Sequence, residues 1–241
     1  MILEFLDDRK KKVLEIIIED YINLAEPIAS SAVVKKHHVD ASPATIRFDM
    51  ADLEKKGYIK KPHTSAGRIP SDKGYRFFVD NLMQNPRISQ KTVKSIKEKF
   101  DSIENLEEEI LSETVELLSF LCGNASIVVS QGKRKSLHSG GISKMLRQPE
   151  FFSSEKSCSV IETIENHPLL TDILDDYTAE NDVPIHIGAE NEHKALKECS
   201  VIARQFGDGG ILCVIGPTRM HYEKVSSALD FFSRLLTEML G

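Results

Sequence analysis

The segment SPATIRFDMADLEKKG, residues 42–57, constrains the fold more than any other part of the chain. Ser42 is suited to cap a helix with its hydroxyl, and Pro43 fits the first helical position, where a backbone N–H is not needed. Gly57 can adopt the left-handed backbone conformation that ends a helix. The segment therefore predicts a short helix with two well-defined ends.

Two further helices are expected before this one. Asp7 and Asp8 can cap a helix that runs to about Asn23, because apolar residues recur there at helical spacing. The loop EPIAS precedes a short second helix that continues to about Lys36. Three consecutive helices are thus predicted in the first 57 residues.

A hairpin is expected directly after the third helix. YIKKP, residues 58–62, is typical of a short strand, HTSAG supplies turn residues, and RIP begins the return strand. A fourth helix then covers about Gly74 to Met83. Three helices followed by a hairpin form the order of a winged helix-turn-helix, which we predict for residues 1–85.

The rest of the chain predicts an α+β domain with a helical connection before it. Residues 88–121 are charged and helical, either as one linker helix with a bend or as two helices, so we assign 86–124 to a linker region. ASIVVS is typical of a strand and QGKRKSLHSGG of a flexible loop. Helices and strands then alternate to the end, which predicts a small sheet with helices in residues 125–241.

Charge is unevenly distributed along the chain. The formal net charge is -6, yet residues 35–76 contain ten Lys or Arg and five Asp or Glu. A basic segment in an acidic protein indicates an anionic partner more clearly than the overall charge does. Duplex DNA is the partner that a winged helix-turn-helix would bind.

The third predicted helix is amphipathic. At 100° per residue, Ile46, Met50 and Leu53 share the inward arc, so the N-terminal half of the opposite face would enter the major groove. Thr45 and Arg47 would reach base edges, while Ala44 and Phe48 could lie against thymine methyl groups. The hairpin would contact phosphates. The predicted DNA-binding residues are Ser42, Ala44, Thr45, Arg47, Phe48, Lys55, Lys60, Lys61, His63, Thr64, Ser65, Arg68 and Lys73.

Simpler interpretations exist for several of these features. A basic outward face is often only a solvated surface, and Phe48 could pack on a second subunit or on a following helix. The glycines at 67 and 74 fit neither phosphate-binding glycine pattern, which argues against a nucleotide loop. Arg219 is expected to form an ion pair with an acid such as Glu190, and His37–His38 is expected to be a surface pair.

Other classes of protein find little support. The four cysteines form no CxxC pair, so neither a zinc site nor a disulfide framework is indicated. No carboxylate pair, nucleophile with a base, or metal-ligand spacing suggests an enzyme, and we expect no catalytic residues, metal or cofactor. No run approaches the ~18 apolar residues of a membrane helix, and the N-terminus does not have the order of a secretory signal. We therefore expect a cytoplasmic protein.

Four separated motifs resemble those of one family. ATIR with the following M-A-x-L-E, PHTSAGRIP with GYRFFVDNL, GGISKMLRQPEF, and GGILCVIGPTRMHY fall in the order found in the heat-inducible transcription repressor HrcA. The resemblance implies a winged-helix domain followed by a GAF-like domain that carries an inserted dimerisation domain. It also implies a dimer on an inverted-repeat operator of chaperone operons, kept active by the chaperonin GroEL, with no cofactor.

The chain departs from that family in its length and in parts of its motifs. It is a shortened member. The missing length falls between about Ser130 and Gly140 and includes the inserted dimerisation domain, which leaves a reduced GAF-like domain. Phe48 stands where the family usually has a polar residue. Two functions are therefore weighed: a dimeric repressor, and a ligand- or protein-sensing module whose DNA binding is weakened.

Overall fold

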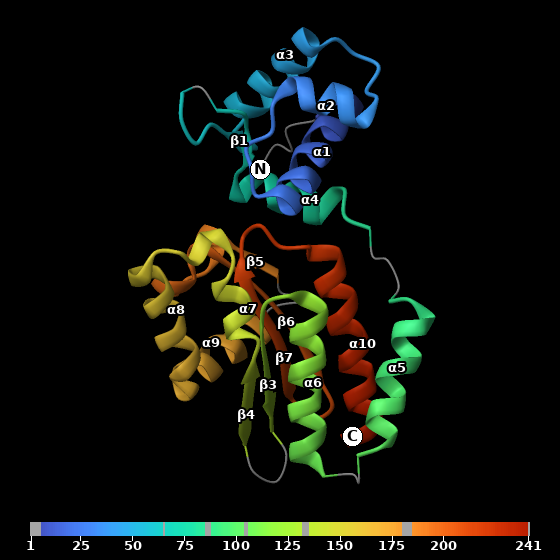
Figure 1. Cartoon of the computed structure of the whole chain (residues 1–241). Coiled ribbons are helices and arrows are strands. Elements are labelled where there is room, and N and C mark those ends of the chain that lie inside the picture. The colour runs from blue at the N-terminus through green and yellow to red at the C-terminus, as the bar shows by residue number, and fades with distance from the viewer. Residues whose placement is uncertain are drawn as a thin grey trace. The chain divides into compact units, whose positions relative to one another are not determined.

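The computed structural model describes residues 6–64, 66–84, 88–103, 106–131, 135–179 and 185–240. The chain divides into two compact units, Met1–Gln84 and Asn85–Gly241 (Figure 1). The three-part domain division expected from the sequence stays a prediction, and each unit is described by itself.

The described residues of the first unit form four helices and one hairpin. Its elements are α1 (Asp8–Leu24), α2 (Ser30–His37), α3 (Pro43–Lys55), β1 (Ile59–Lys60), β2 (Ile69–Pro70) and α4 (Asp72–Asn81). The expected order of these elements is present, although the two strands are shorter than the sequence indicated. Ile28 lengthens the pairing, because it exchanges two backbone hydrogen bonds of 2.8 Å with Arg68.

The core of the first unit follows from the apolar periodicity of α1. Five apolar residues of this helix are completely buried: Val13, Leu14, Ile16, Ile17 and Ile18. They pack against α3, α4 and β2. The segment before β1 and helix α4 approach closely at Gly74, where an added Cβ would lie 2.1 Å from the carbonyl oxygen of Tyr58. Glycine at this helical position is therefore required by packing.

The second unit is built on one five-stranded antiparallel sheet in the order β4-β3-β7-β6-β5. The strands are β3 (Ala125–Ser130), β4 (Ser136–Gly140), β5 (Ile185–Ile187), β6 (Cys199–Phe206) and β7 (Gly210–Pro217). The helices are α5 (Gln90–Asp101), α6 (Glu107–Cys122), α7 (Ile142–Leu146), α8 (Ser154–Glu165), α9 (His167–Ala179) and α10 (Tyr222–Leu240). Short 3₁₀ turns cover Pro149–Phe151, Gly188–Glu190 and Lys194–Leu196.

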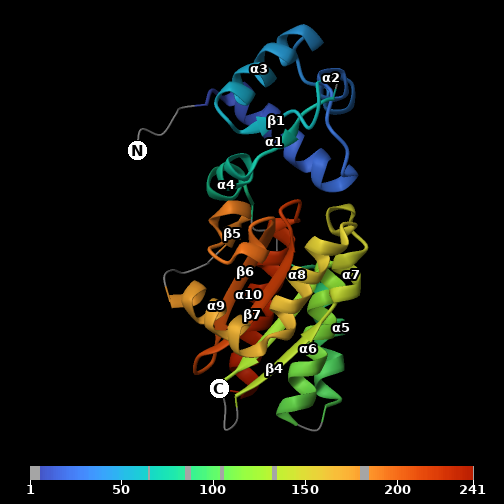
Figure 2. The same cartoon turned by 90° about the vertical axis from the view of Figure 1, so that its left-hand side faces the viewer.

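Helices cover both faces of this sheet (Figures 1 and 2). α6 and α10 pack on one face, and α7, α8 and α9 pack on the other. The central strands β3 and β7 are buried along their whole length, which explains their nearly continuous apolar sequences. Mixed helix and antiparallel sheet confirm the α+β class.

Three local predictions are resolved by the structure. Residues 136–140 form the edge strand β4 rather than a loop, because hydrogen bonding to β3 outweighs the weak strand preference of Ser, His and Gly. The helical stretch 88–121 is two helices, α5 and α6, and α6 packs directly on the sheet. The helix expected near Cys158–Thr171 is divided between α8 and α9 at Asn166.

Replacing Gly74 tests the close packing of α4 on the hairpin. Alanine in a helix interior normally stabilises relative to glycine, by up to about 1 kcal/mol. We expect Gly74→Ala instead to lower the free energy of unfolding by about 1–3 kcal/mol, because the new Cβ overlaps a backbone oxygen. Urea unfolding measures this change, and exposed Lys55→Ala serves as a control that stays within about 0.5 kcal/mol. An unchanged or raised stability for Gly74→Ala would contradict the packing.

Candidate nucleic-acid interface

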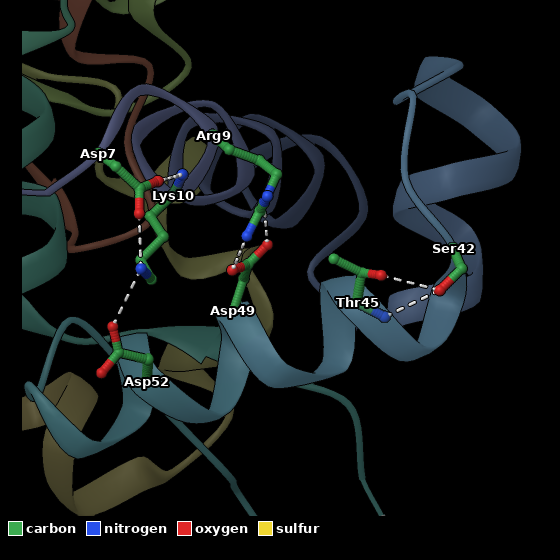
Figure 3. A network of polar contacts seen from close by, with 7 residues as sticks. All are labelled: Asp7, Arg9, Lys10, Ser42, Thr45, Asp49 and Asp52. Atoms are coloured by element: carbon green, nitrogen blue, oxygen red, sulfur yellow. Dashed lines mark hydrogen bonds and ion pairs between the residues drawn. The ribbon is translucent and has the colours of Figure 1, made fainter.

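The start of α3 is fixed by Ser42. Its hydroxyl accepts a hydrogen bond of 3.1 Å from the backbone N–H of Thr45, and the two hydroxyl groups lie 2.9 Å apart (Figure 3). Pro43 occupies the first turn as expected. The predicted N-cap is therefore confirmed, and both hydroxyl groups are engaged within the helix terminus.

The two faces of α3 are as different as the sequence indicated. Ile46, Met50 and Leu53 are buried on the inner face. Phe48 is 77% exposed on the outer face, which is far more than an aromatic side chain usually shows. Along the length of α3, the exposed side chains include those of Ala44, Arg47, Phe48, Ala51 and Lys55. The outer face of α3, which was predicted to contact base edges, is thus exposed within this unit.

A buried charge joins the inner face of α3 to α1. The Asp49 carboxylate is 3% exposed and accepts two hydrogen bonds from Arg9, of 2.7 Å from Nε and 3.0 Å from Nη2 (Figure 3). Sequence reasoning missed this pair. Its signal was an acid on the same arc as Ile46 and Met50, which has to find a cation when it is buried.

The other two acids of α3 are also paired. The Asp52 carboxylate lies 3.4 Å from Lys10 Nζ, which in turn bonds Asp7 at 2.6 Å. The Glu54 carboxylate lies 2.8 Å from Arg68 Nη2, and the Arg68 side chain is only 13% exposed. Carboxylates that would repel a polyanion are therefore neutralised from within the unit. Arg68, expected to line the hairpin surface, is engaged in this neutralisation, and its predicted contact with DNA stays a prediction.

The hairpin presents most of the polar groups expected on it. The exposed ones are Lys60, Lys61, His63 and Thr64. Ser65, also predicted, lies outside the described residues. Lys73 is exposed, but its Nζ donates a 2.8 Å hydrogen bond to the Lys56 carbonyl and lies 4.6 Å from the centre of the Tyr58 ring. Lys73 thus ties α4 to the end of α3.

A second buried acid, Asp20, holds α2 against α1. Asp20 is 4% exposed and lies 2.6 Å from Lys36 Nζ and 3.0 Å from His37 Nε2. Burial alone would raise the pKa of the Asp20 carboxyl, but the hydrogen bonds from Lys36 and His37 outweigh it and hold that pKa below its ordinary value. His37 is therefore a structural partner of Asp20.

The remaining candidates have structural explanations. Arg219 forms an ion pair, as expected, and Glu150 is a partner at 2.6 Å. Glu190, the acid offered as an example, accepts a 2.9 Å hydrogen bond from the backbone of Ile187. Across the described ranges, we find neither a cluster of His, Cys, Asp and Glu able to hold a metal ion nor a helix long and apolar enough to cross a membrane.

The second half of the chain matches a known family model. The model of the HrcA protein C terminal domain matches residues 80–225, which is more than half of the sequence. The chain belongs to the HrcA family. Its fold agrees with one solved structure, a hypothetical protein at 2.2 Å resolution, with a TM-score of 0.77 and 19% identity over 98% of both chains. At that identity, the likeness shows the fold alone.

Curated members of the HrcA family align along nearly the whole chain. The heat-inducible transcription repressor HrcA of Pelotomaculum thermopropionicum is 29% identical and covers 98% of this chain and 97% of its own. That of Symbiobacterium thermophilum is 30% identical and covers 97% and 98%. The first alignment spans 337 residues whereas this chain has 241, so part of the relative has no counterpart here.

The Asp20 network predicts a measurable dependence of stability on pH. Because the folded pKa of Asp20 is lowered, its stabilisation is present above the ordinary value of 3.8 and is lost as the pH falls through the folded value. Asp20→Asn should be less stable than the parent at neutral pH and should lose less stability on acidification. Urea unfolding from about pH 6 to about pH 3 measures both effects.

The matched control is Asp80→Asn, which removes a half-exposed carboxylate paired with Arg76 at 3.2 Å. It should follow the parent curve closely, since exposed pairs contribute little to stability. Identical pH profiles for Asp20→Asn and the parent would contradict the assignment.

Proposed function

We propose that the chain is a DNA-binding transcriptional repressor of the heat-shock response. The observation that carries the proposal is the open outer face of α3, with its acids neutralised and an exposed basic hairpin behind it. The curated HrcA relatives are named heat-inducible transcription repressors, which supports the same function. In this proposal the protein acts by occupying an operator and catalyses no reaction.

The first unit acts in this proposal as a winged helix-turn-helix. α2 and α3 are the paired helices, and the N-terminal half of α3 lies in the major groove. Arg47 would bond a guanine edge, the commonest specific contact of arginine. Lys60, Lys61 and His63 on the hairpin would contact phosphates and so fix the orientation of α3. Arg68 pairs with Glu54 of α3, and Lys73 bonds the carbonyl of Lys56 at the end of that helix.

The second unit is proposed to be a reduced GAF-like domain that serves regulation. Its five-stranded sheet with helices on both faces is consistent with this assignment. The repressor would act as a homodimer on an inverted-repeat operator in the cytoplasm, and GroEL is the partner that the family resemblance implies. Such a homodimer would use surfaces other than the inserted dimerisation domain, which the family resemblance implies for longer members.

A second candidate function is supported by a cavity in the second unit. The cavity has a volume of about 1020 Å³ and lies among α5, α6, β4 and α7, with Leu137, His138 and Lys144 in its lining. This size suits a small ligand. A sensing module with weakened DNA binding would stay monomeric in light scattering even with DNA present, whereas the repressor would show two chains per duplex.

The DNA-binding proposal predicts different losses for two exposed cations. Arg47→Ala should weaken the preferred duplex by about 1–3 kcal/mol and relax base preference. Lys61→Ala should weaken every sequence similarly and reduce the salt slope by about 0.9, because one phosphate contact is lost. Gel-shift titrations at several salt concentrations, on preferred and scrambled duplexes, separate the two effects.

Lys91→Ala is the matched control, because it removes an exposed lysine from α5 in the other unit. It should bind like the parent. Parent-like binding of both duplexes by Arg47→Ala would refute the role given to Arg47, and an unchanged salt slope for Lys61→Ala would refute that of the hairpin.

A further inference from the structure

The outer face of α3 has few groups left for hydrogen bonding to bases. The Thr45 hydroxyl already lies 2.9 Å from that of Ser42, and the Asp49 carboxylate is turned inward to Arg9. Within the first two turns of this fully described helix, Arg47 is the exposed side chain with free donors to offer. One arginine alone cannot define a binding site of several base pairs.

An apolar strip occupies the rest of this face. Ala44, Phe48 and Ala51 are all exposed and are spaced four and three residues apart, so they form one row along the helix. Phe48 is the most exposed of the large hydrophobic residues in the described part of the chain, at 77%. Such exposure costs free energy unless the ring is covered in a complex.

The surroundings of the strip favour a nucleic acid over an apolar protein partner. Arg47 and Lys55 flank it, and exposed Lys60 and Lys61 follow on the hairpin. The acids of α3 are paired within the unit. A positively charged rim around a small apolar row matches a major groove, where phosphates surround base edges.

We propose that Phe48, supported by Ala44 and Ala51, reads the 5-methyl groups of thymine and so determines part of the operator sequence. The proposal rests on the DNA-binding function above and specifies how that surface discriminates. Thymine carries the apolar group on the major-groove edge, and apolar side chains are its partners. The surface would then recognise one guanine through Arg47 and adjacent thymine methyls through Phe48.

Deoxyuridine provides a direct test, because it differs from thymidine only by this methyl group. A duplex is first selected by the parent protein from a random pool, and is then prepared with thymidine or with deoxyuridine throughout. Each methyl lost from a contact should weaken binding by about fourfold. We expect the parent to bind the uracil duplex at least fourfold more weakly, as measured by fluorescence anisotropy.

Phe48→Ala and Phe48→Asn isolate the contribution of the ring from general effects of uracil on the duplex. Both should bind the two duplexes with nearly equal affinity, while their thermal unfolding matches the parent because the side chain is exposed. Phe120→Ala is the control, since Phe120 is 75% exposed on α6 in the other unit. It should retain the parent's discrimination.

The outcomes separate this inference from the function on which it rests. Failure of the parent to enrich any duplex from the pool would overturn the DNA-binding function itself. An enriched duplex bound equally well with thymidine and deoxyuridine, or an unchanged preference for thymidine in Phe48→Ala, would overturn methyl recognition by Phe48 and leave repression standing.

Discussion

The orientation of α3 depends on one buried charge. The Asp49 carboxylate lies on the same face as Ile46 and Met50, and a buried carboxylate is strongly unfavourable without a cation. Arg9 supplies that cation through two hydrogen bonds from the first turns of α1. Rotation of α3 about its axis would break this geometry. Together with the buried apolar arc of α3, the pair therefore fixes which side chains face outward, and with them the surface that we propose binds DNA.

The same arrangement resolves the apparent conflict between an acidic protein and an anionic partner. α3 carries three acids, and each pairs with a cation: two with Arg9 and Lys10 of α1, and the third with Arg68, which directly precedes β2. Arg68 loses most of its exposure in doing so. The residues left on the open side are neutral or basic. Local pairing, and not the net charge of -6, thus sets the electrostatic character of the proposed interface.

The order of elements in the first unit could be predicted because its helix ends depend on local signals. Ser42 and Pro43 act within one turn, and the apolar arc of α3 needs only helical spacing. The Arg9–Asp49 pair joins residues 40 positions apart, so no local pattern reveals it. β4 was missed for a related reason, since its residues become a strand only by pairing with β3. The predicted DNA contacts themselves depend on a partner and stay predictions.

Backbone amide shifts in an NMR titration with the selected duplex test the central claim most directly. If the outer face of α3 and the hairpin bind DNA, the largest shift changes will fall on Ala44–Phe48 and on Lys60–Thr64. Amides of the buried α1 residues Val13 to Ile18 should change little. Shift changes confined to residues 88–240, with α3 and the hairpin unaffected at saturating duplex, would contradict the account.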